Sequence, residues 1–163
     1  MKKLIYTLLI IIALTSNSFS AGTSSDNDSS SKVSDFTKAK NLVKAAKKYE
    51  KKGKIEKAQK RYAKAQKLLL KSNKKKPLQA DTLNYLGFTT RKLGDYEKGE
   101  EFYLQGLQIE PNHNGINEYL GELYIVTNRM DLAKERLEVL KSCDCKEYKQ
   151  LKEIIEGTKK SKY

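Results

Sequence analysis

The clearest alternation of apolar and polar positions lies between residues 80 and 111. One set of apolar and small residues recurs at intervals of three and four, which is one face of an α-helix: Leu83, Leu86, Gly87 and Thr90. The pattern breaks at Gly94, which is free to take the left-handed conformation that ends many helices. A second helical stripe follows and stops at a proline: Tyr96, Gly99, Tyr103, Gly106, Leu107 and Pro111. The pattern predicts two helices joined by a tight turn.

Small residues occupy part of these stripes, at Gly87, Gly99 and Gly106. Because glycine has no side chain to hold two helices apart, the aromatic residues of one helix can seat against the backbone of the other. The segment is therefore predicted to be an antiparallel helical hairpin with an interlocking face of small and large residues.

The same pattern recurs along the chain. A forward shift of 34 residues moves it onto Tyr119, Leu120, Gly121, Asn128, Ala133 and Leu137, and a backward shift of 41 moves it onto Ala45, Ala46, Tyr49, Gly53, Ile55, Ala58, Tyr62 and Ala65. Asn128 stands where the earlier copy has Gly94, and asparagine also tolerates the left-handed conformation. We therefore expect repeats at about 39–72, 80–113 and 114–145, and three repeats are about the minimum for a stable stack.

This unit resembles the tetratricopeptide repeat (TPR), which places a Leu-Gly pair in its first helix, a Gly-x-Tyr turn, a small and then an aromatic residue in its second helix, and a closing proline. The positions that carry the resemblance are Leu86, Gly87, Gly94, Asp95, Tyr96, Gly99, Tyr103 and Pro111. The family's usual Trp is Leu83 here, and its usual first-helix Tyr is Thr90. The resemblance implies an all-α fold, a short right-handed α-α superhelix (TPR solenoid) of about three helical hairpins plus a C-terminal capping helix.

The capping helix is expected at residues 146–157, followed by a polar tail at 158–163. Its apolar stripe consists of Tyr148, Leu151, Ile154 and Ile155. An array needs a helix of this kind because the last repeat otherwise exposes an apolar face. The spacing of Cys145, Tyr148 and Leu151 also resembles the C-terminal end of small exported repeat proteins of bacteria.

Residues 1–20 have the features of a secretory signal peptide. Lys2 and Lys3 precede an apolar run from Leu4 to Leu14, and Ser18-Phe19-Ser20 supplies small residues before a cut ahead of Ala21. The alternative is an uncleaved anchor, but the run is shorter than the roughly 20 residues of a spanning helix. We expect cleavage, a periplasmic or secreted protein without a transmembrane span, and a disordered polar tether at 21–37.

The net charge of +13 is concentrated in the first repeat. Residues 36–77 contain 17 Lys or Arg and two acidic residues, a net charge of +15, whereas the rest of the chain after residue 20 contains 14 basic and 18 acidic residues, a net charge of −4. One interpretation is the solvated outer face of a terminal repeat. The other is a basic surface for a polyanion or an anionic membrane: Lys40, Lys44, Lys47, Lys48 and Lys51. Export argues against nucleic acid as the natural partner.

Few residues suggest catalytic or metal chemistry. Cys143 and Cys145 form the single cysteine pair, and in an oxidising compartment we expect them to be disulfide-bonded. The bond is either a staple at the turn into the capping helix, an intermolecular link or a redox site. His113 is the single histidine, which is too few for a metal site. Since no nucleophile motif or phosphate loop is visible, we predict a protein that is not an enzyme and that has no cofactor or metal.

The remaining candidate surface is the concave groove lined by the first helices of the repeats. Six residues beside the packing stripe are predicted to face this groove: Asn84, Tyr85, Phe88, Arg91, Tyr119 and Glu122. Aromatic side chains with polar neighbours are typical binding anchors, although one or two of these rings would instead pack between repeats. The resemblance implies that such grooves bind extended or helical peptides. We therefore predict an exported scaffold or adaptor for protein–protein interaction, with polyanion binding by the first repeat as the alternative.

Overall fold

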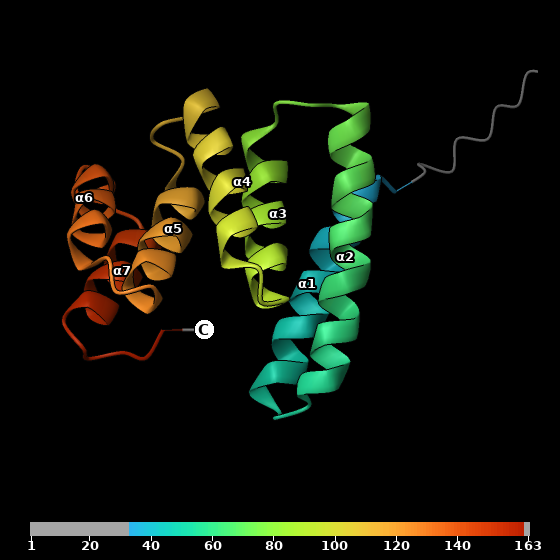
Figure 1. The fold of residues 1–163 in the computed structure, drawn as a ribbon, viewed down its shortest axis with the longest axis horizontal. Helices are drawn as coiled ribbons and strands as arrows, with labels where there is room; N and C mark the ends of the chain where they lie inside the picture. Colours follow the sequence, from blue (N-terminus) through green and yellow to red (C-terminus); the bar gives the residue numbers. More distant parts are fainter. Residues whose placement is uncertain (1–32, 162–163) are drawn as a thin grey trace, which may run out of the picture. The chain divides into compact units, whose positions relative to one another are not determined.

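The computed structural model describes residues 33–161, and within that range the chain is α-helical without any strand (Figure 1). Its helices are α1 (Asp35–Lys51), α2 (Ile55–Lys75), α3 (Ala80–Lys92), α4 (Tyr96–Ile109), α5 (Asn114–Val126), α6 (Met130–Leu140) and α7 (Lys146–Ile155). The all-α prediction is confirmed. The predicted signal peptide and most of the predicted tether lie outside the described residues.

The first six helices form three antiparallel hairpins, α1–α2, α3–α4 and α5–α6, which follow one another along the stack (Figure 1). The first helices of the hairpins make an inner row, in which α1 contacts α3 and α3 contacts α5. The second helices make an outer row, and α2 and α4 each contact the first helix of the next hairpin, α3 and α5. Helix α7 packs against both α5 and α6. It therefore covers the last hairpin, as the sequence predicts for a capping helix.

The turns follow from local residue chemistry. Gly94 has φ of +99° and Asn128 has φ of +58°, so both equivalent positions adopt the left-handed conformation that the sequence predicts. The start of α1 corrects the predicted tether boundary, because residues 35–37 are helical. The Ser34 hydroxyl accepts a hydrogen bond from the Thr37 backbone N–H at 3.1 Å, which caps the first turn.

Small residues set the close approach of the helices. A Cβ atom placed on Gly87 would lie 2.5 Å from the ring of Tyr103, so this glycine lets the α4 aromatic ring seat on the α3 backbone. In the same way, Gly106 receives Ile116 of the next hairpin. Interlocking of small and large residues, predicted within the second hairpin, also joins neighbouring hairpins.

Two groups of buried side chains form the core. One centres on the first hairpin and α3 and includes Tyr62, Leu69 and Phe88. The other joins α4, α5 and α6 around Tyr103 and Leu120. No helix among residues 33–161 is both long enough and apolar enough to cross a membrane.

Candidate functional site

Two adjoining hollows lie along the inner row of helices. The first, about 410 Å³, is lined by α1 and α3 residues: Lys40, Asn41, Val43, Lys44, Lys47 and Tyr85. The second, about 330 Å³, is lined by residues of α1, α3, α5 and α7: Lys47, Asn84, Tyr85, Gly115, Glu118, Tyr119, Lys146, Glu147 and Gln150. Lys47 and Tyr85 belong to both hollows, so together the hollows form one groove across the inner row. We call this the inner groove.

Three of the six predicted groove residues line this groove. Tyr85 and Tyr119 are half-buried, and each presents part of its ring to the hollow. Asn84 is only 6% exposed, and its side-chain nitrogen lies against Gly115, where any larger residue would collide with it. The two tyrosines therefore form the accessible floor, and the buried Asn84 lies beside them.

The other three predicted groove residues are buried and line neither hollow, so the prediction that they face the groove is wrong. Phe88 and Arg91 are each 2% exposed, and Glu122 is 0% exposed. Phe88 and Glu122 occupy equivalent positions, directly after the small residue of the Leu-Gly pair. In the stack Phe88 meets the rings of Tyr62 and Tyr119, and Glu122 lies 4.0 Å from Arg91, so both side chains face neighbouring helices instead of the groove.

Arg91 is the centre of a buried cluster of aromatic rings beneath the groove floor. Its guanidinium carbon lies 5.6 Å from the ring centres of Phe88 and Tyr103 and 5.3 Å from that of Tyr119. The guanidinium donates a hydrogen bond to the Tyr119 backbone carbonyl at 2.6 Å, and it lies 4.0 Å from the Glu122 carboxylate. Burial lowers the pKa of Arg91, and the surrounding rings and carboxylates oppose that shift. The cluster fixes α3 against α5.

Lys47 crosses the groove floor, so it is not a member of the open basic surface that the sequence predicts. It is half-buried, its Nζ atom donates a hydrogen bond to the Tyr119 hydroxyl at 3.0 Å, and the same atom lies 4.2 Å from the centre of the Phe88 ring. Burial raises the pKa of Tyr119, and the nearby Glu118 carboxylate adds to this effect. The hydroxyl is therefore a neutral acceptor for the lysine.

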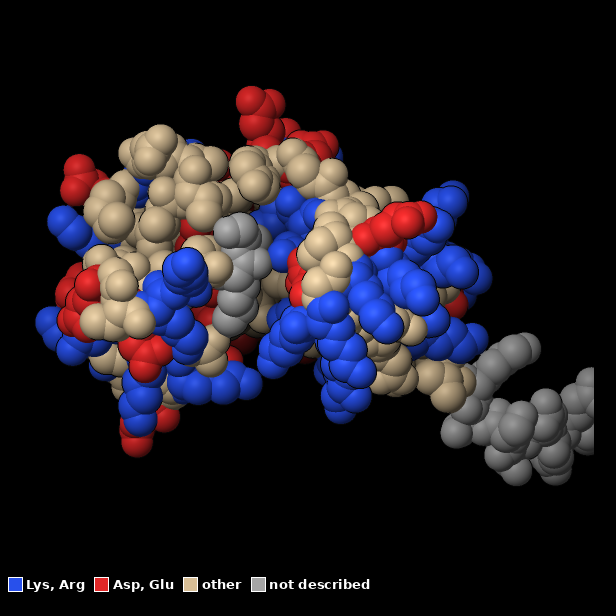
Figure 2. Space-filling view, turned by 90° about the horizontal axis from the view of Figure 1, so that it is seen from below, with Lys and Arg blue, Asp and Glu red and all other residues tan. Residues whose placement is uncertain are grey.

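The other four residues of the predicted basic surface, Lys40, Lys44, Lys48 and Lys51, are exposed. Lys40 and Lys44 line the first hollow, and the Lys40 ammonium lies over the rings of Phe36 and Tyr85. Figure 2 shows Lys and Arg gathered over the end of the molecule that carries α1 and α2, whereas the other end mixes both signs of charge. The groove is thus most basic along its α1 side.

Helix α7 contributes to the groove, which the sequence analysis did not predict. Lys146, Glu147 and Gln150 come from its first turns and line the second hollow. The signal in the sequence is a polar stripe at these positions beside the apolar stripe that packs on α5. The helix that caps the stack is therefore also a wall of the groove.

The cysteine pair lies directly before this wall. The sulfur atoms of Cys143 and Cys145 are 2.08 Å apart, which is the predicted disulfide within one chain. Cys145 is the N-cap residue of α7. This position agrees with the staple interpretation, since the bond joins the turn after α6 to the start of α7.

His113 has a structural role at the start of α5. Its Nδ1 atom accepts a hydrogen bond from the Ile116 backbone N–H at 3.1 Å, so the imidazole caps the helix. Among residues 33–161, no group of three or more His, Cys, Asp or Glu side chains is arranged to hold a metal ion.

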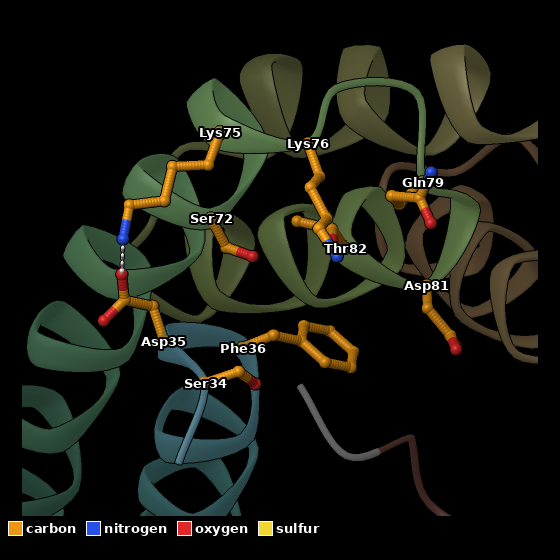
Figure 3. A pocket seen from close by; sticks show the side chains of 9 residues that line it. All are labelled: Ser34, Asp35, Phe36, Ser72, Lys75, Lys76, Gln79, Asp81 and Thr82. Carbon is orange, nitrogen blue, oxygen red and sulfur yellow. Dashed lines mark hydrogen bonds and ion pairs between the residues drawn. The ribbon is translucent and has the colours of Figure 1, made fainter. Parts of the chain in front are cut away.

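Another hollow, of about 340 Å³, lies at the end of the first hairpin beside α3 (Figure 3). Phe36 extends toward it, and Lys75 of α2 pairs with Asp35 at 3.0 Å. Phe36 also meets Tyr85 edge to face, with ring centres 5.7 Å apart. This hollow is separated from the inner groove by those two rings.

The comparisons with known proteins agree with this architecture. The family model described as tetratricopeptide repeat matches residues 80–113. SycD, the type III secretion translocator chaperone of Yersinia enterocolitica, is similar with a TM-score of 0.53 and 15% identity, over 77% of this chain and 85% of that chain. The second TPR of Spaghetti (RPAP3), solved bound to the HSP90 peptide SRMEEVD, is similar with a TM-score of 0.41 and 16% identity, over 63% of this chain and 89% of that chain. No curated protein matches this sequence.

The repeat match covers α3, α4 and the turns that flank them, which are the residues in which the hydrophobic pattern is clearest. The match with SycD extends the fold to the hairpins on either side. Residues 80–113 are therefore a tetratricopeptide repeat, and the described part of this chain is an α-helical repeat protein of the TPR fold.

Proposed function

We propose that this protein is an exported scaffold or adaptor that binds a segment of another protein in the inner groove. The observation that carries the proposal is the continuity of the groove, since two hollows share Lys47 and Tyr85 and span the three inner helices and α7. The TPR fold suggests a role in protein–protein interaction, and SycD, which shares the fold, is a translocator chaperone. Export is part of the proposal because of the signal-like residues 1–20.

The chemistry of the groove favours an extended segment with acidic side chains toward α1. Lys40, Lys44 and Lys47 line the α1 side, whereas Glu147 and Lys146 place both signs of charge at the α7 side. From α1 to α7 there are three steps between helices of about 9 Å each. At about 3.4 Å per residue, roughly eight extended residues cross this distance.

The residues around the groove favour binding over catalysis. Tyr85 and Tyr119 present aromatic rings to the groove, which suit contact with a peptide backbone and its side chains. The fold and the chaperone and adaptor proteins that resemble it also point to a protein that is not an enzyme. The groove is therefore proposed as a recognition surface.

Site-specific photo-crosslinking in the native cells tests this proposal. A photoreactive phenylalanine analogue is placed at Tyr85 in the groove or, as a matched control, at Tyr96, which is 42% exposed at the start of α4. We expect a defined protein adduct from position 85 and none from position 96. Crosslinks from position 96 alone would contradict a groove function and place the interaction on the outer row.

Once mass spectrometry has identified the adduct, the variant Tyr85→Ala is used to measure how much this ring contributes to binding. A peptide covering the crosslinked segment is titrated into the unchanged protein and into the Tyr85→Ala variant, and calorimetry gives the two affinities. Loss of a central aromatic anchor typically costs about 2 kcal/mol of binding, so we expect roughly 30-fold weaker binding. Unchanged affinity would show that the ring is not an anchor.

A further inference from the structure

The outer surface of α2 carries a continuous stripe of lysines that the inner groove does not use. Six exposed lysines recur at intervals of three and four along this helix: Lys57, Lys60, Lys64, Lys67, Lys71 and Lys74. They lie opposite the buried face that contains Tyr62 and Leu69. From Lys57 to Lys74 the stripe is about 25 Å long at 1.5 Å per residue. We call it the α2 lysine face.

The acidic residues nearby neutralise little of this charge. Residues 35–75 contain three acidic side chains, and each is already paired: Asp35 with Lys71 and Lys75, Glu50 with Lys92, and Glu56 with Lys60. Lys57, Lys64, Lys67 and Lys74 have no ion pair within the described residues. Since 16 Lys or Arg also lie in residues 35–75, the first hairpin keeps a net charge of +13.

The rest of the fold has the opposite charge. Residues 80–156 contain 10 basic and 15 acidic residues, a net charge of −5. Near an extended anionic surface, the first hairpin is attracted and the other hairpins are repelled. The charge distribution therefore orients the molecule with the first hairpin toward such a surface.

We propose that the α2 lysine face binds the surface of an anionic phospholipid bilayer. The cations are almost all lysines, which act as hydrated point charges and suit a diffuse layer of headgroups. The one arginine of the hairpin, Arg61, lies over the Tyr49 ring. The face belongs to the outer row, so a broad surface can meet it along its whole length.

A linear polyanion fits this face less well. Proteins that bind single-stranded nucleic acids combine a basic channel with aromatic rings that stack on the bases. The α2 lysine face has no ring among its members, and both hollows of the inner groove lie on other helices. Binding through α2 therefore leaves the inner groove open to a protein partner.

Co-sedimentation with vesicles tests the proposal with the full chain. The vesicles contain phosphatidylcholine alone or with about 30% phosphatidylglycerol, and binding is measured at low and high salt. In the test variant, the four lysines of the face that have no ion pair are changed: Lys57→Gln, Lys64→Gln, Lys67→Gln and Lys74→Gln. The control variant removes the same charge from exposed positions of the other hairpins and α7: Lys98→Gln, Lys134→Gln, Lys141→Gln and Lys152→Gln.

We expect the unchanged chain to bind phosphatidylglycerol vesicles at low salt and to be released near 0.5 M salt, where screening is strong. The test variant should bind at least tenfold more weakly, whereas the control variant should stay within about twofold. Far-UV circular dichroism of each variant should remain helical, since all eight side chains are exposed.

Three results would overturn the proposal. An equal loss in both variants would show that only net charge matters. Equal binding of all variants to pure phosphatidylcholine would assign the affinity to the apolar N-terminal sequence. If the test variant lost binding to heparin or DNA but still bound the vesicles as the unchanged chain does, the face would be assigned to a linear polyanion.

Discussion

The substitution Phe88→Ala tests whether the Phe88 ring is part of the core or an anchor for a binding partner. The Phe88 ring is 2% exposed and meets the Tyr62 ring edge to face at 5.8 Å and the Tyr119 ring at 5.1 Å. Lys47 adds an ammonium 4.2 Å from the ring centre. Truncation thus removes contacts with α1, α2 and α5 at once, and it leaves a cavity between these helices and α3.

The expected cost follows from these contacts. Replacing a buried phenylalanine by alanine typically destabilises a protein by about 3 to 5 kcal/mol. Each aromatic pair contributes about 0.5 to 1.5 kcal/mol beyond the buried area, so the upper part of that range applies here. A loss of this size is a large fraction of the stability of a single domain, which is about 5 to 15 kcal/mol.

Urea unfolding followed by far-UV circular dichroism measures the effect. The matched control is Leu104→Ala on the outer row, where the side chain is 43% exposed and we expect a change below about 1 kcal/mol. If Phe88→Ala also costs less than about 1 kcal/mol and instead abolishes partner binding, the ring is an anchor of the groove. Phe88 would then contribute to binding and not to the core.

Four further predictions follow from other parts of the fold. Gly121→Leu should displace α7 and destabilise the chain by about 1 to 3 kcal/mol, because even a Cβ atom at this position would lie 2.6 Å from Leu151. Faster hydrogen exchange of the α7 backbone amides would show the displacement. Replacing both cysteines by Ser should lower the melting temperature modestly and leave the helical signal intact. Stability should fall as the pH rises above about 10, because burial raises the folded-state pKa of Tyr103 above that of the unfolded chain; denaturant titrations at pH 8 and 11 test this. Mass spectrometry of the native protein should find an N-terminus near Ala21, and an intact Met1 would contradict export with cleavage.

The hairpins were predictable because their signals are local. The Leu86-Gly87 pair recurs as Leu120-Gly121 after 34 residues, and Gly94 and Asn128 mark equivalent turns. Each of these signals needs only helical periodicity and the conformational preference of one residue. No knowledge of the neighbouring repeat is required.

The groove was only partly predictable because exposure depends on the neighbouring repeat. On a single helix, Phe88 and Arg91 lie beside the packing stripe, a position that is solvent-exposed in an isolated hairpin. The close approach of α1, α3 and α5 buries both. A charged residue tolerates this burial because Arg91 finds the Tyr119 ring and the Glu122 carboxylate in the next hairpin. That pairing joins residues 31 positions apart and has no local signature.

The hydrogen bond from Lys47 to Tyr119 alters how this stack should unfold. In a repeat array with contacts only between adjacent units, a terminal hairpin peels away after losing a single interface. Here the first hairpin holds the third directly, across 72 residues and past α3. Detaching α1 therefore also releases a tyrosine hydroxyl of α5, so bending or stretching of the stack is resisted over three units together. Widening the groove between α1 and α5 should therefore break this hydrogen bond, at a cost of about 0.5 to 1.5 kcal/mol.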